Sequence, residues 1–324
     1  RRVFTPAIPF KNFVIVGRDE LANEVRRFYL LNPDEGYRFL GYINSSNQTS
    51  ILDSISRINQ KDEIHEIFCC VSEIAQQDLQ NLVQFGLNSL VKVKLLIKPG
   101  IVSAAIQLSE NDRSPGINIP VVALDDRFNR YIKRVFDITF SFLFCLFVMS
   151  WLTPLIAILI KFDSFGPVFF VQLRSGEGNR PFYCLKFRTM KVNEHSDILQ
   201  ATKNDNRITK FGAFLRKSSI DELPQFFNVL MGNMSVVGPR PHMLKHTEEY
   251  SKLIDRFMTR QYIKPGITGL AQCLGYRGET KSLSDMANRV RLDRYYIENW
   301  TFWLDIKIIF LTIISLIRGS DKAY

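Results

Sequence analysis

The sequence predicts a Rossmann-like α/β domain over residues 1–125, a linker and apolar membrane segment over residues 126–165, and an α+β, membrane-associated domain over residues 166–324. Three observations support this fold class. Short apolar runs alternate with amphipathic stretches in the first third of the chain, a pattern typical of a parallel sheet covered by helices. A charge-free apolar run follows, and motifs rich in charge and proline fill the rest. The length of 324 residues exceeds what one hydrophobic core usually supports.

The net charge of +10 favours a partner with negative charge, such as nucleic acid, anionic lipid or a phosphorylated substrate. Aromatic residues lie in apolar stretches instead of alternating with basic ones, so we expect no nucleic acid. The five cysteines form no Cys-x-x-Cys pair and the four histidines match no zinc motif, so reduced thiols are expected. Because the first residue is Arg1 rather than Met, we expect a piece of a longer protein.

The first domain has four predicted strands, at residues 12–16, 37–43, 66–71 and 91–97, separated by helices at residues 19–31, 51–58 and 74–87. The first turn carries Asp19 where the dinucleotide-binding fingerprint has its second glycine. A carboxylate there would repel a pyrophosphate, so we expect a scaffold without a nucleotide and no tight NAD binding. Asp19 equally suits the N-cap of the helix that follows it.

The apolar run from Ile138 to Ile160 contains no charge. As a helix at ~1.5 Å per residue it would reach about 34 Å, enough to cross a hydrocarbon core of ~30 Å. Pro154 interrupts the helical hydrogen bonds, and the hydroxyl of Thr153 can help to satisfy a freed carbonyl. Positive charges flank both ends, at Lys133, Arg134 and Lys161. The residues alone fit either a spanning helix or a bent, re-entrant one.

A strand is predicted at residues 168–172 and a returning strand at residues 182–190. In the second strand, Lys186 and Arg188 alternate with apolar residues, so both can project from one face toward an anion. A charged edge strand is the alternative.

Two adjacent carboxylates, Asp221 and Glu222, follow the basic Arg216 and precede Pro224. Proline fits only the first turn of a helix, which favours Asp221 as the N-cap, although Ser219 with Glu222 also matches a capping box. A helix start can direct both carboxylates to one site and favours phosphate. Two carboxylates beside a phosphate need a cation, and Mg²⁺ is the expected one.

Further candidates follow in the same region. Arg240 stands between two prolines, which reduces the entropy lost when its guanidinium is positioned. Arg277 and Asp293 come after a rigid Lys-Pro-Gly turn. Residues 300–317 are apolar but include Asp305 and Lys307, so a helix lying on the membrane surface is expected there.

Residues 131–324 resemble the polyprenyl-phosphate phosphoglycosyl transferases, the monotopic bacterial sugar transferase family. Eight motifs in family order carry the resemblance, at residues 133–137, 166–172, 186–190, 206–212, 215–225, 237–241, 264–269 and 293–300. Residues 11–125 resemble the Rossmann-like regulatory domain of the long members. The family has Ser-Pro at its helix break, where this chain has Thr153-Pro154.

The resemblance implies transfer of a phospho-sugar from a UDP-sugar to polyprenyl (undecaprenyl) phosphate, with release of UMP. This would be the first membrane step of surface glycan assembly, for exopolysaccharide, capsule or O-antigen. Asp221 would be the nucleophile that forms a covalent phospho-sugar intermediate, and Glu222 its partner, both beside Mg²⁺. Substrate contacts are expected from Lys186, Arg188, Arg216, Arg240, Arg277 and Asp293.

The resemblance also implies a re-entrant helix, a homodimer and contact with membrane lipid. The enzyme would lie in the inner (cytoplasmic) membrane, with its catalytic domain on the cytoplasmic face. No motif identifies the sugar. Two rival functions remain open at this point: a nucleotide-sugar oxidoreductase or epimerase that uses the first domain, which Asp19 disfavours, and a lipid-binding scaffold in which Asp221 is dispensable.

Overall fold

The computed structural model describes residues 11–44, 50–97, 117–118, 122–192, 205–276, 278 and 282–318. The chain divides into two compact units, Arg1–Pro120 and Val121–Tyr324, here called the first and second units. Each unit is described by itself.

The first unit contains a sheet with strand order β2-β1-β3-β4-β5. The strands are β1 (Lys11–Val16), β2 (Tyr37–Ile43), β3 (Glu66–Cys70), β4 (Lys92–Leu96) and β5 (Ile117–Asn118). The first four are parallel and β5 is antiparallel to β4. The predicted parallel sheet is confirmed, whereas the short β5 was not predicted because two residues give no periodic signal.

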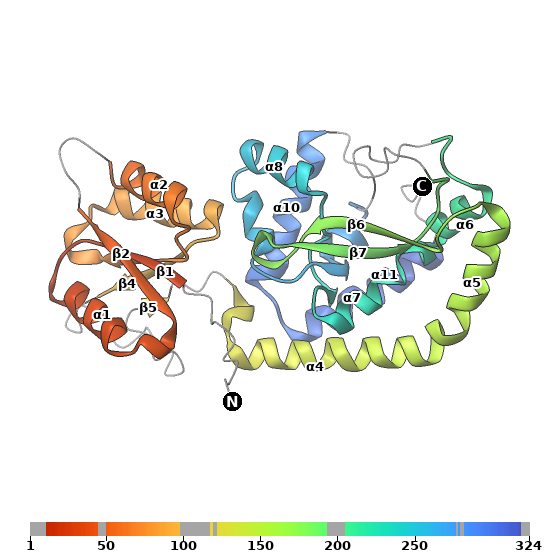
Figure 1. The fold of residues 1–324 in the computed structure, drawn as a ribbon, viewed down its shortest axis with the longest axis horizontal. Coiled ribbons are helices and arrows are strands. Elements are labelled where there is room, and N and C mark those ends of the chain that lie inside the picture. Colours follow the sequence, from red (N-terminus) through yellow and green to blue (C-terminus); the bar gives the residue numbers. More distant parts are fainter. Residues whose placement is uncertain are drawn as a thin grey trace, which may run out of the picture. The chain divides into compact units, whose positions relative to one another are not determined.

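Helices cover both faces of this sheet (Figure 1). Phe13 and Ile15 of β1 pack with α1 (Glu20–Leu31), whereas Val14 and Val16 pack with the other two helices, α2 (Ile51–Lys61) and α3 (Gln76–Ser89). Successive residues of a strand point to opposite faces, so a strand buried on both faces is a continuous apolar run.

Asp19 is the N-cap of α1, as one of the two interpretations predicted. Its Oδ1 accepts from the backbone N–H of Ala22 at 2.9 Å and from Sγ of Cys70 at 3.2 Å, and its Oδ2 accepts from Oγ of Ser72 at 3.0 Å. Glu73 accepts from the backbone N–H of Arg18 at 2.6 Å. Carboxylates therefore accept from two backbone N–H groups that follow β1, the turn in which a dinucleotide site offers donors to a pyrophosphate.

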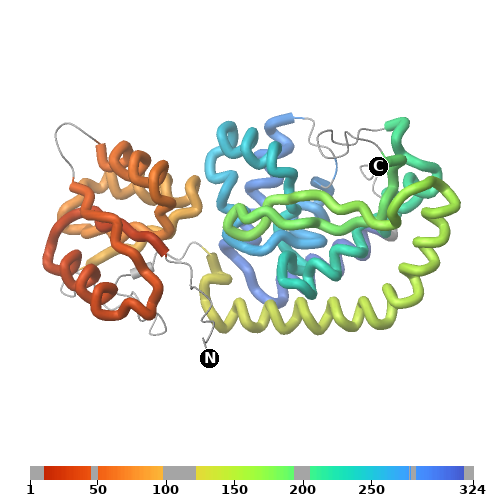
Figure 2. The backbone as a smooth tube through the Cα atoms, in the orientation of Figure 1, coloured from red at the N-terminus to blue at the C-terminus, as the bar shows by residue number. Residues whose placement is uncertain are grey.

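The second unit begins with a long helical segment that bends. It consists of α4 (Arg127–Phe144), a π-helical turn (Cys145–Met149) and α5 (Ser150–Asp163). Figures 1 and 2 show that α4 and α5 run in clearly different directions. In the described part of the chain, only this helix, Arg127–Asp163, has the length and apolar composition to cross a membrane.

The bend contains Pro154 within α5 and the π turn one helical turn earlier. Ser150 Oγ donates to the carbonyl of Leu146 at 2.6 Å, and Trp151 Nε1 donates to that of Phe147 at 2.9 Å. Side-chain donors thus serve carbonyls within the irregular turn. The role predicted for Thr153 is wrong, because its hydroxyl is buried and has no hydrogen-bond partner among the described residues.

Two of the three positive charges that flank the apolar segment are bonded within the protein, whereas Lys161 is exposed. Lys133 forms a buried ion pair of 2.7 Å with Asp305 of α11 (Phe302–Arg318). Arg134 donates to the carbonyls of Val229 and Leu230 at 2.7 and 3.0 Å, near the end of α7 (Gln225–Met231). Charged side chains therefore fix the first half of the long helix to α7 and α11 of the same unit.

The remaining elements form the body of the second unit. An antiparallel hairpin joins β6 (Phe169–Ser175) to β7 (Pro181–Phe187), and β8 (Ser235–Val237) pairs in parallel with β9 (Gly266–Thr268). The helices are α6 (Lys210–Ser218), α7, α8 (Leu244–Leu253), α9 (Leu270–Cys273), α10 (Leu283–Glu298) and α11.

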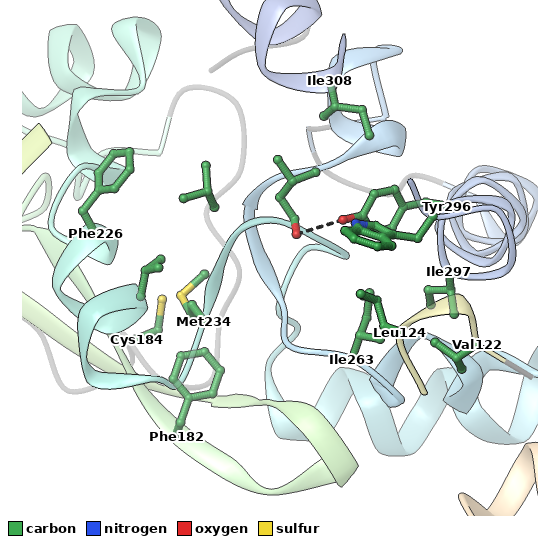
Figure 3. Packing of buried hydrophobic residues seen from close by; sticks show 14 residues of the cluster. Val122, Leu124, Phe182, Cys184, Phe226, Met234, Ile263, Tyr296, Ile297 and Ile308 are labelled. Atoms are coloured by element: carbon green, nitrogen blue, oxygen red, sulfur yellow. Dashed lines mark hydrogen bonds between the residues drawn. The ribbon is translucent and has the colours of Figure 1, made fainter. Parts of the chain in front are cut away.

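The core of the second unit joins the hairpin to the C-terminal helices. Figure 3 shows Phe182 and Cys184 of β7 close to Phe226 and Met234, and Tyr296 of α10 with its hydrogen bond drawn. The hydroxyl of Tyr296 donates to the carbonyl of Val237 at 3.2 Å. This packing fixes β7, α7 and the segment after β8, which carry the polar residues described next.

Candidate active site

The two adjacent carboxylates lie in a 3₁₀ turn, Ile220–Glu222, between α6 and α7. Ser219 has φ 59° and ends α6, and the chain then re-enters helical geometry without a break. The N-cap position of α7 is Pro224, so the prediction that Asp221 is the N-cap is wrong. The capping box does not form either, because Ser219 makes no side-chain cap hydrogen bond. The backbone carbonyls of Ser219 and Ile220 accept from the N–H groups of Glu222 and Leu223, so these donors do not need a carboxylate as acceptor.

Glu222 binds two cations that come from distant segments. Its Oε1 lies 2.7 Å from Nζ of Lys186 on β7 and 2.7 Å from Nη2 of Arg240. Nη1 of Arg240 donates to Oε2 of Glu222 at 3.2 Å and to Oε1 of Gln272 at 3.2 Å. Glu222 is only 5% exposed, so this bidentate arrangement is held away from bulk water.

Asp221 differs from its neighbour, because no hydrogen bond or ion pair with the described residues reaches its carboxylate. The pKa of Asp221 is raised to about 6, chiefly by burial and also by the charge of Glu222, while Lys186, Arg216 and Arg240 act in the opposite direction. The group is therefore mainly ionised at pH 7 and protonated in mild acid. A buried carboxylate without a bonded partner, close to three cations, is suited to nucleophilic or metal-binding chemistry.

The structure thus brings together five of the predicted site residues: Asp221, Glu222, Lys186, Arg216 and Arg240. Lys186 contributes from the hairpin, Arg240 from the segment after β8, and Arg216 from the last turn of α6 through its charge on Asp221. Three cations around two carboxylates leave the site with a net positive charge, which favours an anionic ligand such as a diphosphate.

Arg188 is bonded to a different element. It follows the last residue of β7, and its Nη2 donates to the carbonyl and the hydroxyl of Ser164 at 2.6 and 3.0 Å, at the end of α5. Gly166, with φ 129°, leaves the space that Arg188 occupies, since a Cβ at that position would collide with Nη1. Arg188 lies just beyond β7 and is bonded through Nη2 to the end of α5, whereas its Nε and Nη1 are buried and have no hydrogen-bond partner among the described residues. That Lys186 and Arg188 face one anion therefore stays a prediction.

Asp293 lies in a separate buried cluster. Its Oδ2 forms an ion pair of 2.8 Å with Nη2 of Arg260, and both residues are almost fully buried. Arg260 was not predicted, because a single arginine within the short turn Phe257–Gln261 has no periodic or motif signal. Arg277, also predicted to bind substrate, lies outside the described residues.

The residues fit Mg²⁺ only if substrate provides further oxygens. Within the described ranges, no group of three or more His, Cys, Asp or Glu side chains could hold a metal ion. Asp221 offers an unbonded carboxylate, whereas both oxygens of Glu222 already accept from Lys186 or Arg240. Mg²⁺ commonly binds one or two carboxylates and completes its shell with water and phosphate oxygens, so the pair is compatible with it.

A carboxylate pair among cations, in the same unit as a long apolar helix that bends, is suited to binding an anionic ligand. Comparison with known families agrees: the model of the bacterial sugar transferase family matches residues 128–319. The chain belongs to this family, which confirms the resemblance to polyprenyl-phosphate phosphoglycosyl transferases. The family is membrane-associated.

Three relatives illustrate the similarity. The chain is 36% identical over 343 residues to the UDP-glucose:undecaprenyl-phosphate glucose-1-phosphate transferase of Xanthomonas campestris pv. campestris, with 99% of the chain and 69% of that protein aligned. It is 44% identical to the Klebsiella pneumoniae protein of the same name, over 78% of the chain and 55% of that protein. It is 43% identical to the exopolysaccharide production protein PSS of Rhizobium leguminosarum bv. phaseoli, over 58% of the chain and 97% of that protein. The chain thus covers little more than half of the Klebsiella relative.

Proposed function

We propose that the protein transfers a sugar phosphate from a UDP-sugar to undecaprenyl phosphate, giving undecaprenyl-diphospho-sugar and UMP. The names of the relatives support this reaction, and the Rhizobium name supports a role in exopolysaccharide production. The observation that carries the proposal is the buried carboxylate of Asp221 beside a Glu222 bound to Lys186 and Arg240. Because two relatives are named for glucose transfer, UDP-glucose is the first donor to test.

The proposed mechanism has two displacements at phosphorus. In the first, a carboxylate oxygen of Asp221 attacks the sugar-linked phosphorus of the donor, the phosphoanhydride bond breaks, and UMP leaves with the bonding electron pair. In the second, an oxygen of undecaprenyl phosphate attacks the same phosphorus and displaces the carboxylate. Splitting the transfer lets a soluble donor and a membrane-bound acceptor use one site in turn.

The cations of the site would reduce the repulsion between Asp221 and a diphosphate. Lys186 and Arg240 supply charge to the phosphate oxygens while they remain anchored by Glu222, and Arg216 acts from α6. Mg²⁺, held by Asp221 and Glu222 together with donor phosphates, would supply further positive charge to the leaving group when bound. Glu222 would have to exchange one cation contact to bind it or to act as a base for the acceptor.

We further propose that the long helix is re-entrant, with both ends on the cytoplasmic face of the inner membrane. The bend at the π turn and Pro154, and the anchoring of Lys133 and Arg134 within the second unit, support this topology. A test would place single cysteines at the exposed positions Tyr131 and Phe165, in a variant without the five native cysteines, and label intact and opened cells. Labelling of one position from outside intact cells would contradict re-entry.

We propose that the first unit is a Rossmann-like, doubly wound domain that regulates or stabilises the enzyme without binding a nucleotide. Its mainly parallel sheet of order β2-β1-β3-β4-β5, with helices on both faces, supports a doubly wound fold, although the order is the flavodoxin-like one. Calorimetry with NAD on the whole protein tests this, and micromolar affinity would overturn it.

We also propose a homodimer. Mass measurement of the protein in lipid nanodiscs decides between dimer and monomer.

The central experiment measures UMP release from a panel of UDP-sugars in the presence of undecaprenyl phosphate. Separately, donor labelled in the sugar-linked phosphate is added without acceptor. Wild-type protein should retain label on a peptide that contains Asp221, and Asp221→Asn should not. Turnover without a labelled protein would exclude the covalent mechanism, and undiminished turnover by Asp221→Asn would favour a different active site. Absence of turnover with every donor would favour the lipid-binding scaffold.

A further inference from the structure

The segment that carries Arg240 is held from behind by a buried arginine. Arg260 is 4% exposed and lies in the 3₁₀ turn Phe257–Gln261. Its Nη2 donates to the backbone carbonyl of Arg240 at 2.9 Å, and its Nη1 lies 2.8 Å from Nε2 of His242. One guanidinium therefore contacts the segment at two points that are two residues apart.

The contact with His242 is attractive because the imidazole is neutral. Burial, and next the charge of Arg260, lower the pKa of His242 well below its ordinary value. A neutral imidazole has one nitrogen with a free lone pair, which accepts from a guanidinium N–H. His242 is thus a hydrogen-bond acceptor at neutral pH, and it gives Arg260 a second fixed point on the segment.

Asp293 supplies the charge that allows Arg260 to be buried. Its Oδ2 lies 2.8 Å from Nη2 of Arg260, and the side chain is 2% exposed. A buried charge is strongly destabilising unless it is paired, so removing the partner of Arg260 would leave its charge uncompensated. Arg289, on the same helix as Asp293, donates to the carbonyl of Gly278 at 2.9 Å and adds to the positive charge around Asp293.

The backbone that Arg260 holds is the one from which Arg240 reaches the carboxylate pair. The adjacent prolines restrict φ within the segment, and the carbonyl of Pro239 accepts from the N–H of Gly266 at 2.9 Å. On the C-terminal side of Pro239, Arg260 holds the carbonyl of Arg240 and the ring of His242. A bidentate guanidinium contact with Glu222 depends on this position, because both N–H groups must meet their acceptors at once.

We propose that Arg260 and Asp293 form a positioning pair for Arg240: Asp293 neutralises Arg260, and Arg260 fixes the backbone from which Arg240 binds Glu222. The inference rests on the proposed function and deepens it. It assigns Asp293 an indirect role in place of the direct substrate contact expected from the sequence. The pair acts on the reaction only through Arg240.

A double-mutant cycle on turnover tests this dependence. Asp293→Asn should lower kcat by about 10- to 100-fold, since a small misplacement of a catalytic contact has effects of this size. In an Arg240→Lys background, which has already lost the bidentate contact, the same change should lower kcat by less than about threefold. An equal loss in both backgrounds would mean that Asp293 acts on substrate independently, and would overturn the proposal. Asp255→Asn is the matched control, because that side chain is 60% exposed.

Hydrogen exchange of a peptide that covers residues 236–246 provides a readout independent of turnover. Asp293→Asn should speed exchange in this peptide and leave the peptides of the first unit unchanged, whereas Asp255→Asn should change neither. Unchanged exchange around Arg240 would also overturn the proposal. Should Asp293→Asn fail to fold, Arg260→Lys keeps the buried charge balance and provides the same two measurements. If the wild type releases no UMP with any donor, the proposed function fails, and hydrogen exchange still decides the positioning role.

Discussion

Two aspartates that precede helices, Asp19 ahead of α1 in the first unit and Asp221 ahead of α7 in the second, have opposite environments. Asp19 accepts hydrogen bonds from a backbone N–H, a hydroxyl and a thiol, all within 3.2 Å. Asp221 is 9% exposed, has no such bond with the described residues, and has a pKa raised to about 6 by burial. The same side chain therefore stabilises a fold in one unit and is available for chemistry in the other.

The difference arises from the backbone before each helix. Asp19 is in an extended conformation ahead of α1, so its side chain can reach the N–H of Ala22. Asp221 lies within a helical turn that continues toward α7, where neighbouring carbonyls already accept from the backbone donors. The carboxylate of Asp221 caps no helix, and it interacts electrostatically with the nearby cations Lys186, Arg216 and Arg240.

The largest expected effect is that of Asp221→Asn, which should lower turnover by roughly a thousandfold or more, as loss of a nucleophile does. The same variant should be more stable than wild type at pH 7. The raised pKa means that ionising Asp221 opposes folding, and an amide removes this opposition, on the order of 1–3 kcal/mol. Kinetics of UMP release and thermal unfolding of one preparation measure both effects.

An inactive variant that is also destabilised would contradict this account, because the loss could then reflect unfolding. Asp255→Asn is the matched control for an exposed aspartate, and neither quantity should change in it.

Arg240→Lys should lower turnover by about 10- to 100-fold, because one ammonium cannot reproduce the two N–H contacts with Glu222. The expected loss is smaller than for Asp221, since positive charge remains. Steady-state kinetics with UDP-glucose measure it. Arg38→Lys in the first unit, where the side chain is 62% exposed, serves as the control and should behave as wild type. Near-normal turnover by Arg240→Lys would remove Arg240 from the site.

Turnover should fall by about tenfold between pH 7 and pH 5, because a carboxyl with a pKa near 6 is about one-tenth ionised at pH 5. Stability should change in the opposite sense. The folded state has the higher pKa, so the contribution of Asp221 to stability is full below its ordinary value near 3.8 and is lost as pH rises through 6. A pH profile of kcat with saturating substrates measures the first effect. A flat profile from pH 5 to 7 would show that ionisation of Asp221 does not limit the reaction.

The sequence was informative where signals are local and much less so where partners are distant. The strands of the first unit follow from apolar runs bounded by turns, and the Asp221–Glu222 pair was found from its charge and the proline after it. The bond of Arg188 to Ser164 was not predicted, because Ser164 belongs to another element. The pairing of Lys133 with Asp305 joins residues 172 positions apart, and neither position has a local signal of the other.

The smallest expected effect on turnover is that of Asp19→Ala. This variant tests whether Asp19 has only a structural role in the first unit. Removing the cap should destabilise α1 by about 1–2 kcal/mol. The control Ser50→Ala removes a cap that accepts one backbone hydrogen bond, from Asp53, and should destabilise α2 by about 0.5–1 kcal/mol. Hydrogen exchange in the two helices measures the difference. Turnover should remain within about twofold of wild type, because Asp19 contacts only residues of its own unit in the hydrogen bonds described above. A large loss of turnover with α1 still protected would show that the first unit takes part in the reaction, and the division of roles between the two aspartates would no longer hold.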